Sequence, residues 1–230
     1  MSIDTYQRMS NIQSRLDLIR DSLPQGTRLV AVSKFHPASM IQEAYQAGQR
    51  IFGESHVQEL QEKRHQLPED IKWHFIGHLQ TNKVKYIAPY ISMIHSADSP
   101  HLLAEISKQA LKYDRKIPCL LQLHVAQEET KFGFTPQECL DFMAQGEWRS
   151  MAGILLSGVM CMASNVDDEA QIAYEFDQAR QVFQTLKVQY FSHDDSFCEC
   201  SWGMSNDYHI AIRHGSTLVR VGSLIFGQRV

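Results

Sequence analysis

The chain has 230 residues, of which 43% are hydrophobic, and a formal net charge of −4. This length suits one barrel domain of the (β/α)8 type, which typically takes about 250 residues. The acidic balance argues against sequence-independent binding of nucleic acid, and no apolar run approaches the roughly 18 residues typical of a membrane span. The polar amino terminus, 1–21, lacks the pattern of a signal peptide, and an odd number of irregularly spaced cysteines indicates reduced thiols in a cytoplasmic protein.

Apolar runs alternate with helical patterns from the start of the chain. Ile12, Leu16 and Ile19 at helical spacing predict an opening helix over 2–23. The run 29–33 predicts a first strand that is buried on both faces, which is typical of a parallel sheet covered by helices. Further strands are predicted at 50–54, 72–76, 91–95, 118–125 and 153–160, and helices at 37–47, 57–65, 81–87, 100–113, 135–144 and 167–188.

The carboxyl-terminal part contains one ambiguity. Two segments, 190–191 and 197–202, compete for the seventh strand, and the second is favoured because 207–213 follows as a helix. The eighth strand is predicted at 217–221. Eight strands alternating with helices favour a closed (β/α)8 TIM-like barrel over an open doubly wound sheet. We therefore expect a single domain over 1–230, with an extra amino-terminal helix.

Lys34 ends the first apolar run, at the edge where a parallel barrel opens to solvent or ligand. Burying an ammonium group is costly unless the lysine finds a partner or loses its proton. A lysine placed here can use a lowered amine pKa to form a Schiff base with an aldehyde cofactor. Taken alone, the same stretch is also typical of a solvated residue that begins a loop.

Polar and ionisable groups follow most of the predicted strands, where barrel enzymes place their functional residues. A single polar residue at a strand end has an ordinary explanation, because strand ends are exposed. Their convergence on one mouth of the barrel is the stronger indication of a site. These positions are Lys34, Glu54, His78, His95, His124, Met160, Ser205 and Gly222.

Glycines and serines gather in the carboxyl-terminal stretch, as Gly203-Met204-Ser205, Gly215-Ser216 and Gly222-Ser223. Glycine lets the backbone approach an anion closely, and successive N–H groups cradle phosphate oxygens. Barrels often hold phosphate in the loops after strands seven and eight, where two of these three groups fall. By themselves the glycines are also typical of turns. Combined with a strand-end lysine they predict a phosphorylated aldehyde, and pyridoxal 5′-phosphate (PLP) is the obvious candidate.

Motifs along nearly the whole chain resemble those of the pyridoxal phosphate homeostasis protein family (YggS/PROSC type). In order they are AVSKFHP at 31–37, FGESHVQEL at 52–60, WHFIGHLQTNK at 73–83, HSADS at 95–99, KFGF at 131–134, SGVMCMA at 157–163 and WGMSNDYHIAIRHGSTLVRVGSLIFG at 202–227.

The resemblance implies a barrel of the fold type III PLP class, related to the amino-terminal domain of bacterial alanine racemase. It also implies a cofactor bound to Lys34 as an internal aldimine, with Ser205, Gly222 and Ser223 around the phosphate and Arg220 facing the pyridine nitrogen. The predicted cofactor-binding residues are Lys34, Ser55, Met204, Ser205, Arg220, Gly222 and Ser223. No catalytic residue and no metal ligand is expected.

The chain departs from the family pattern at several positions. Ser55 and His56 stand where asparagine and tyrosine usually follow the FGE motif. His124 replaces a usual asparagine, His209 stands where an acidic residue is common, and the segment 193–200 is atypical. These differences concern contacts beside the ring, and they leave the lysine and the phosphate loops unchanged.

Arg220 decides which chemistry is expected of this site. A guanidinium remains protonated, so a pyridine nitrogen bonded to it stays unprotonated and the ring becomes a poor electron sink. Racemisation also needs an acid–base residue opposite Lys34, and the chain leaves no residues for a second domain that would supply one. We expect a monomeric PLP carrier in PLP homeostasis, serving PLP-dependent apoenzymes with little or no turnover. The alternative is an amino-acid racemase or lyase with His78, His95 or Tyr208 as the second base.

A third hypothesis is a metal-dependent hydrolase that uses His74, His78, His95 and His124. His74 and His78 are four residues apart, but they flank a strand, where that spacing separates them by about two pleats. Cys198-Glu199-Cys200 with His193 is a further pattern for zinc, but a lone C-x-C is more typical of buried or loop thiols. In the predicted helix 57–65, Glu59 and Glu62 are expected on a solvated face.

Overall fold

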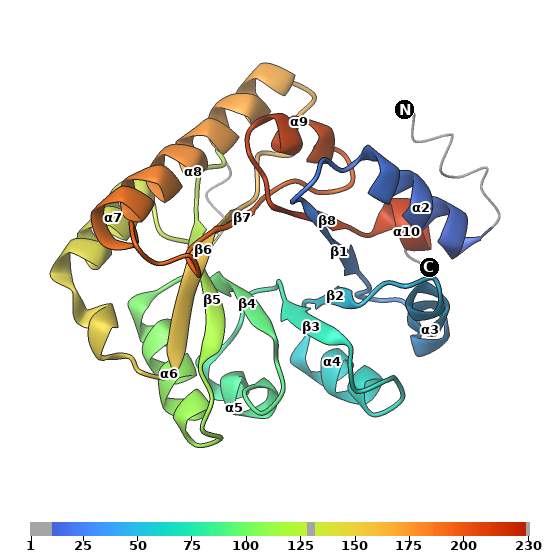
Figure 1. Cartoon of the computed structure of the whole chain (residues 1–230), viewed down its shortest axis with the longest axis horizontal. Coiled ribbons are helices and arrows are strands. Elements are labelled where there is room, and N and C mark those ends of the chain that lie inside the picture. Colours follow the sequence, from blue (N-terminus) through green and yellow to red (C-terminus); the bar gives the residue numbers. More distant parts are fainter. Residues whose placement is uncertain (1–10, 128–131, 229–230) are drawn as a thin grey trace.

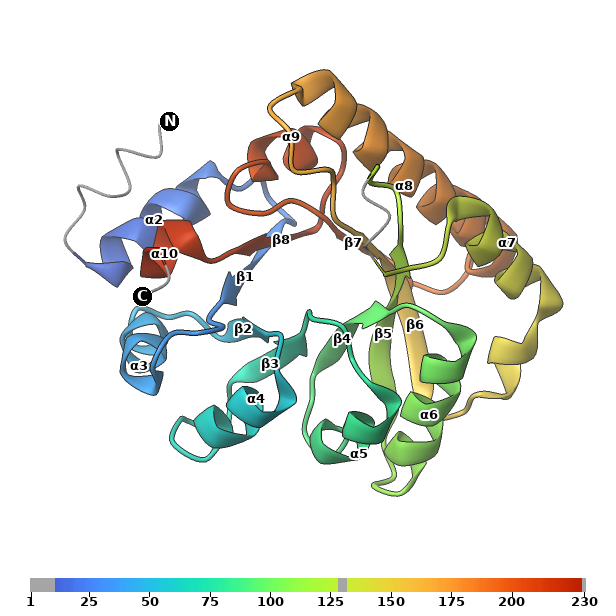
Figure 2. The ribbon, with the colours of Figure 1, turned by 180° about the vertical axis from the view of Figure 1, so that it is seen from behind.

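The computed structural model describes residues 11–127 and 132–228. Eight parallel strands close into a barrel in the order in which they occur along the chain, and the first strand pairs with the last. The helices form an outer ring around the strands (Figure 1), and the view from behind shows the same arrangement (Figure 2). The predicted (β/α)8 barrel, with a helix before its first strand, is confirmed.

The elements have the following bounds. The strands are β1 (Arg28–Val32), β2 (Ile51–Glu54), β3 (Lys72–Phe75), β4 (Met93–Ala97), β5 (Ile117–Leu123), β6 (Ile154–Cys161), β7 (Glu199–Ser201) and β8 (Leu218–Val221). The α-helices are α2 (Ile12–Ser22), α3 (Ala38–Gln46), α4 (Val57–Arg64), α5 (Val84–Ile87), α6 (Pro100–Leu111), α7 (Pro136–Gln145), α8 (Glu169–Tyr190), α9 (Tyr208–Arg213) and α10 (Ser223–Phe226). Short 3-10 turns are η1 (Thr81–Lys83) and η2 (Glu147–Ser150). Within these described segments, no helix is long and apolar enough to cross a membrane.

Local sequence signals explain where the helices begin and end. At α7 the Thr135 hydroxyl accepts the Glu138 N–H at 3.2 Å, and the Glu138 carboxylate accepts the Thr135 N–H at 2.8 Å, which together form a capping box. Pro136 occupies the first turn, where its missing N–H costs nothing, and Gly146 ends the helix at a φ of 78°. The predicted opening of this helix at 135 is therefore correct.

Strand β4 lies two residues later than the predicted strand at 91–95. Ile91 still donates its N–H to Ile87 at 2.9 Å, so the end of the preceding helix takes up the first residues of the apolar run. His95 is consequently in the middle of β4 and fully buried, and its predicted place at a strand end is wrong. Met160 likewise lies inside β6 and not at its end. Of the two candidates for the seventh strand, the favoured segment is correct, because Tyr190 is the last residue of α8.

Two apolar layers stabilise the barrel. The larger layer lies between the strands and the helices, and a small inner cluster fills the barrel with Val30, Met93, Leu120, Met160 and Leu218. Gly158 in β6 has a φ of 150°, and a Cβ there would overlap the backbone carbonyl of Glu199. Glycine at this position therefore lets β7 approach β6, which places the carboxyl ends of β6, β7 and β8 side by side.

Candidate functional site

A cavity of about 260 Å³ opens at the carboxyl ends of the strands, close to the lower end of the range of about 300–1,000 Å³ for small-molecule sites. Six of the seven predicted cofactor-binding residues line it, contributed by the loops after β1, β7 and β8 and by β8 itself. They are Lys34, Met204, Ser205, Arg220, Gly222 and Ser223. Segments that are far apart in sequence thus meet at one site.

Lys34 lies two residues beyond the end of β1, in a turn, with its side chain half-buried. The turn begins as an extension of the sheet, because the Ser33 N–H donates to the Gly53 carbonyl of β2 at 3.0 Å. It then bends sharply, because Phe35 has a φ of 66° in the left-handed region that non-glycine residues seldom adopt. The bend turns the chain away from the sheet immediately after the lysine.

The loops after β7 and β8 are joined directly to each other. The Gly222 N–H donates to the Ser205 hydroxyl at 3.2 Å. A Cβ on Gly222 would lie 3.0 Å from the Val32 carbonyl oxygen, so glycine allows the β8 loop to pack closely on the end of β1. The carboxylate of Asp207, which also lines the cavity, accepts the Met204 N–H at 2.5 Å and so supports the β7 loop. Serine hydroxyls and backbone amides therefore gather on the side of the cavity formed by β7 and β8.

Arg220 forms a cationic wall of the cavity and is held from two neighbouring strands. Its Nη1 donates to the Ser201 carbonyl at 2.7 Å and to the Ser201 hydroxyl at 2.6 Å, and its Nη2 donates to the Cys161 carbonyl at 2.9 Å. The side chain is 4% exposed, and burial lowers the pKa of the guanidinium from its usual value. Arg220 also lines the cavity, so a rigidly held cation forms part of its wall.

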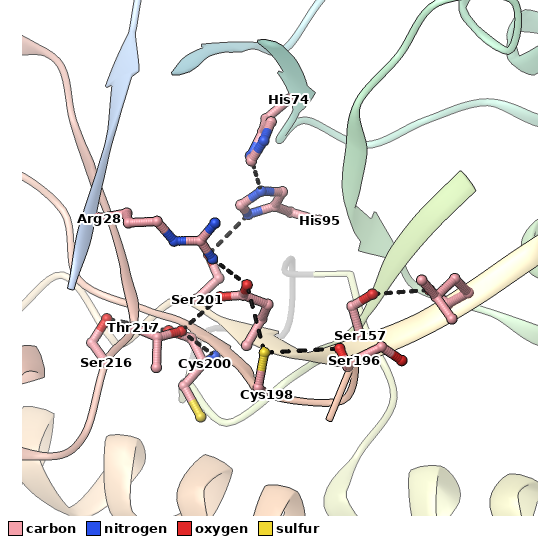
Figure 3. Close-up of polar contacts among 12 residues, drawn as sticks. Arg28, His74, His95, Ser157, Ser196, Cys198, Cys200, Ser201, Ser216 and Thr217 are labelled. Carbon is pink, nitrogen blue, oxygen red and sulfur yellow. Dashed lines mark hydrogen bonds and ion pairs between the residues drawn. The ribbon is translucent and has the colours of Figure 1, made fainter. Parts of the chain in front are cut away.

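Hydrogen bonds join His74, His95 and Ser201 inside the barrel (Figure 3), and Ser201 is the residue that Arg220 contacts. His95 Nδ1 lies 2.9 Å from the Ser201 hydroxyl, and His95 Nε2 lies 2.8 Å from His74 Nδ1. Burial lowers the pKa of His74 to about 3 and lowers that of His95 well below its usual value, with the charges of Arg28 and Lys72 adding to the effect on His74. Both imidazoles are therefore neutral at physiological pH.

The positive charge of Arg220 determines which atoms donate and which accept along these hydrogen bonds. Because Nη1 donates to the Ser201 oxygen, the Ser201 hydroxyl hydrogen is best directed away from the cation, toward His95 Nδ1. His95 then carries its proton on Nε2 and donates it to His74. The dipoles along these hydrogen bonds consequently point the same way, and they hold Ser201 in the orientation that Arg220 requires.

A second polar cluster lies beneath the Lys34 turn. Lys63 of α4 is 5% exposed, and its Nζ donates to the Ser33 carbonyl at 2.7 Å, to Glu54 Oε1 at 2.7 Å and to Glu59 Oε1 at 2.6 Å. Glu59 Oε1 also accepts the Phe35 N–H at 2.5 Å. The expectation of a solvated Glu59 is therefore wrong, whereas Glu62 on the same helix is exposed as expected.

Glu54 belongs to this cluster and not to the barrel mouth where the sequence placed it. Its side chain is fully buried, and Oε1 accepts the Ser33 hydroxyl at 2.6 Å. Burial raises the pKa of Glu54 to about 7, although the neighbouring Lys63 favours the carboxylate. Oε2 has no hydrogen-bond partner among the described residues. The raised pKa agrees with the geometry, because only one of the two carboxylate oxygens of Glu54 accepts hydrogen bonds.

Ser55 lies apart from the other predicted site residues. It lines a different cavity of about 430 Å³ together with His56 and His78, beside the loops that follow β2 and β3. The backbone of the β3 loop explains this placement, because a Cβ on Gly77 would overlap Ser55. Glycine there lets the two loops pack tightly and holds Ser55 within this neighbouring cavity.

The histidines proposed for other chemistry are dispersed. His74 and His95 bond to each other inside the barrel, while His78 pairs with Asp98 at 2.8 Å and stacks on Phe132 at the rim. Within 11–127 and 132–228 no group of three or more His, Cys, Asp or Glu residues is placed to hold a metal ion. The suggested second bases, His78, His95 and Tyr208, are absent from the described lining of the cavity around Lys34.

Several contributors to the site were missed in the sequence. The loop 162–165 lines the cavity. Because functional residues of a barrel follow the carboxyl ends of its strands, this loop would have been predicted if the sixth strand had been extended to Cys161. Ser201 lies in a three-residue strand that is too short for an alternating pattern to identify its inward face. The Cys161 contact with Arg220 uses a backbone carbonyl, so the residue type carries no signal for it.

The barrel, with a lysine after its first strand and hydroxyl and amide donors after its last two, defines a class of protein related to the racemase barrels. The model of the family described as "Alanine racemase, N-terminal domain" matches residues 8–230. The alanine racemase of Bartonella henselae has the same fold, with a TM-score of 0.72 at 15% identity, and the match covers 95% of this chain and 58% of the racemase chain.

Proteins with higher sequence identity to this chain identify the family within that class. A pyridoxal phosphate homeostasis protein of Schizosaccharomyces pombe is 37% identical over 96% of this chain and 94% of its own length, and one of Aquifex aeolicus is 32% identical over 99% of each. PipY of Synechococcus elongatus, in a structure with PLP bound, has a TM-score of 0.85 at 34% identity, covering 94% of this chain and 100% of that chain. The chain belongs to the pyridoxal phosphate homeostasis protein family.

Proposed function

We propose that this protein binds PLP in the cavity around Lys34, as a Schiff base, and acts as a PLP carrier with little or no turnover. The observation that carries the proposal is the meeting of Lys34, Arg220 and the joined Ser205–Gly222 loops at one cavity. An amine, a guanidinium and a group of hydroxyl and amide donors together match an aldehyde, a ring nitrogen and a phosphate. PLP bound to PipY supports the same assignment.

Each part of the site has a definite task in this proposal. Lys34 would hold the aldehyde through its amine, as a reversible carbon–nitrogen double bond whose formation releases the aldehyde oxygen as water. Ser205, Gly222 and Ser223 hold the phosphate through hydroxyl and amide donors. Met204, at 36% exposure, covers the ligand from the rim. Ser55 is not part of this assignment, because it lines the neighbouring cavity.

Arg220 supports the expectation of low turnover. When bound, PLP supplies an electron sink for carbanions, and that sink is strongest when the pyridine nitrogen is protonated. Arg220 donates protons in hydrogen bonds and accepts none, so a ring nitrogen that faces it acts as the acceptor and stays unprotonated. Holding the aldehyde by a reversible bond, without promoting chemistry at the amino acid, suits storage and delivery.

The proposal also covers the oligomeric state, the cellular compartment and the partners of the protein. We propose that a monomer works in the cytoplasm and passes PLP to PLP-dependent apoenzymes. The thiols support a reducing compartment, since no disulfide joins any of the five cysteines, all of which lie in the described part of the chain: Cys119, Cys139, Cys161, Cys198 and Cys200. Light scattering of the purified protein tests the monomer, and restoration of activity in a PLP-free apoenzyme mixed with the loaded protein tests delivery.

The decisive experiment is a visible spectrum of purified protein mixed with PLP, followed by borohydride reduction and peptide mapping. We expect a visible absorbance band and a reduced adduct on Lys34. The Lys34→Ala variant should show neither, and Lys85→Ala, which alters an exposed lysine on α5, should behave as the wild type. Conversion of an amino acid by the pure protein, lost in Lys34→Ala, would favour a racemase or lyase instead. A wild-type protein that cannot be loaded with PLP would overturn the proposal.

A further inference from the structure

The two peptide groups that flank Lys34 are both held by charged side chains of α4, the buried Lys63 and the partly buried Glu59. On the amino-terminal side, the Ser33 carbonyl accepts a hydrogen bond from Lys63 Nζ at 2.7 Å. On the carboxyl-terminal side, the Phe35 N–H donates to Glu59 Oε1 at 2.5 Å. Lys63 and Glu59 are themselves joined at 2.6 Å, one helical turn apart on α4. A single ion pair therefore spans the Lys34 backbone from one peptide group to the other.

The backbone at this point requires such support. Phe35 has a φ of 66°, which places a residue with a Cβ in the strained left-handed region. Its side chain is 51% exposed, and its ring packs against the exposed His56 with the ring centroids 5.1 Å apart. Strained backbone persists where the surrounding contacts over-determine it, and the bond from the Phe35 N–H to Glu59 is a charge-assisted contact of this kind.

The cluster is anchored in the barrel wall as well as in the helix. Glu54 is the last residue of β2, and its Oε1 accepts from both Lys63 Nζ and the Ser33 hydroxyl, at 2.7 Å and 2.6 Å. Lys63 is 5% exposed and Glu54 is fully buried, so water competes weakly for these bonds. The cluster thus connects the ends of β1 and β2 to α4 through side chains that do not touch the cavity around Lys34.

We propose that Glu59 and Lys63 are positioning residues for Lys34: they fix the turn so that the lysine amine is presented to an aldehyde bound in the cavity. This inference rests on the proposed function for the identity of its ligand. It assigns a role to α4, a helix that contributes nothing to the described lining of the cavity. The amine of a correctly held lysine reacts with a bound aldehyde at a rate set by geometry, and a misplacement of about 1 Å costs up to about 100-fold.

The test compares two ligands that differ only at the reacting group. PLP carries an aldehyde that Lys34 attacks, whereas pyridoxine 5′-phosphate carries an alcohol at the same carbon and binds through its ring and phosphate alone. A variant that misplaces only Lys34 weakens binding of PLP and leaves binding of pyridoxine 5′-phosphate unchanged. A variant that damages the whole barrel weakens both, so the ratio of the two affinities separates positioning from general structural loss.

Each variant changes one side chain in the full-length protein, and Glu59→Ala also removes an acceptor of Lys63 Nζ. Glu59→Ala removes the acceptor for the Phe35 N–H, and we expect PLP loading to slow and PLP affinity to fall by about tenfold or more. Glu59→Gln keeps an acceptor oxygen and should recover most of the loading rate. Glu62→Ala alters an exposed carboxylate on the same helix and serves as the matched control. Circular dichroism and the thermal midpoint of each apo-protein report on folding.

The outcomes separate the two proposals. A selective loss of PLP affinity in Glu59→Ala, with unchanged affinity for pyridoxine 5′-phosphate, supports the positioning role. Equal losses for both ligands, or no loss for either, overturn that role and leave the proposed function standing. A wild-type protein that binds neither ligand overturns the proposed function and the positioning role together.

Discussion

Nε2 of His95 lies 2.8 Å from Nδ1 of His74, so histidines from neighbouring strands share one hydrogen bond inside the barrel. Two imidazolium ions could not occupy these positions, because burial penalises each charge and the two charges would repel. Protonation of either histidine would therefore disturb the hydrogen bonds that run from His95 through Ser201 to Arg220.

Acid should destabilise the protein through this pair. The folded-state pKa of His74 is lowered to about 3 from 6.5, so the unfolded state binds more protons between these values, and stability is lost as pH falls through that window. The wild type should lose about 1 kcal/mol more than His74→Gln between pH 6 and pH 5, since a full proton difference is worth about 1.4 kcal/mol per pH unit. Urea unfolding at each pH measures this. The exposed His101→Gln should keep the wild-type slope, and an equal slope in His74→Gln would contradict the assignment.

Glu54 should make the protein less stable as pH rises, which is the opposite of the effect of His74. Its folded-state pKa is raised to about 7 from 4.5, so the folded state binds more protons in this window, and the stability contributed by Glu54 is lost as pH rises through it. Relative to Glu54→Gln, which does not titrate, the wild type should become less stable by about 2 kcal/mol between pH 5 and pH 7. Denaturant unfolding of both proteins across this range is the measurement. A stability difference that stays constant with pH would show that Glu54 is already ionised at pH 5.

Gly158 should be intolerant of a side chain. At a φ of 150°, a Cβ there would overlap the carbonyl of Glu199, and backbone cannot move aside as the tip of a side chain does. We expect Gly158→Ala to cost about 3 kcal/mol or more. Gly48→Ala is the matched control, because Gly48 has a φ of 86° but nothing lies within 4 Å of its added Cβ, so only backbone strain of about 1 kcal/mol remains. Similar losses in the two variants would indicate that β7 shifts to make room.

Arg220 should matter for stability even in the absence of a ligand. Arg220→Leu leaves the Ser201 and Cys161 carbonyls without their guanidinium donor in a buried place, and we expect a loss of about 2–3 kcal/mol in the apo-protein. Chemical denaturation at neutral pH measures the loss. Arg213→Leu, which removes a surface partner of Glu169, should change stability by less than about 1 kcal/mol. An apo-protein unaffected by Arg220→Leu would restrict this arginine to a role in ligand binding.

The repeating features of the chain were predictable, and the side-chain contacts between elements were not. Apolar runs and helix signals place all eight strands, because burial on both faces and capping are local in sequence. The position of His95 depends on where the preceding helix ends, and it was placed two residues wrongly relative to β4. Glu59 resembles any charged residue on a helix. Its pair with Lys63 is local to α4, whereas Phe35 meets it only after α4 packs beside β1 and β2. Lys34 was found because its position follows from the strand itself.

The length of the pairing between neighbouring strands differs around the barrel. β7 has three residues, and its pairing with β8 in the described structure consists of Ser201 opposite Leu218. Backbone hydrogen bonds continue on either side of this pair, from the Thr217 N–H to the Cys200 carbonyl and from the Arg220 N–H to the Gly203 carbonyl, both at 2.9 Å, and the Arg220 side chain adds its bonds to Ser201. Because β7 is the shortest of the eight strands, we expect exchange of amide hydrogens with solvent to begin along β7, next to the cavity. Local opening of the barrel at this strand would expose the wall formed by Arg220.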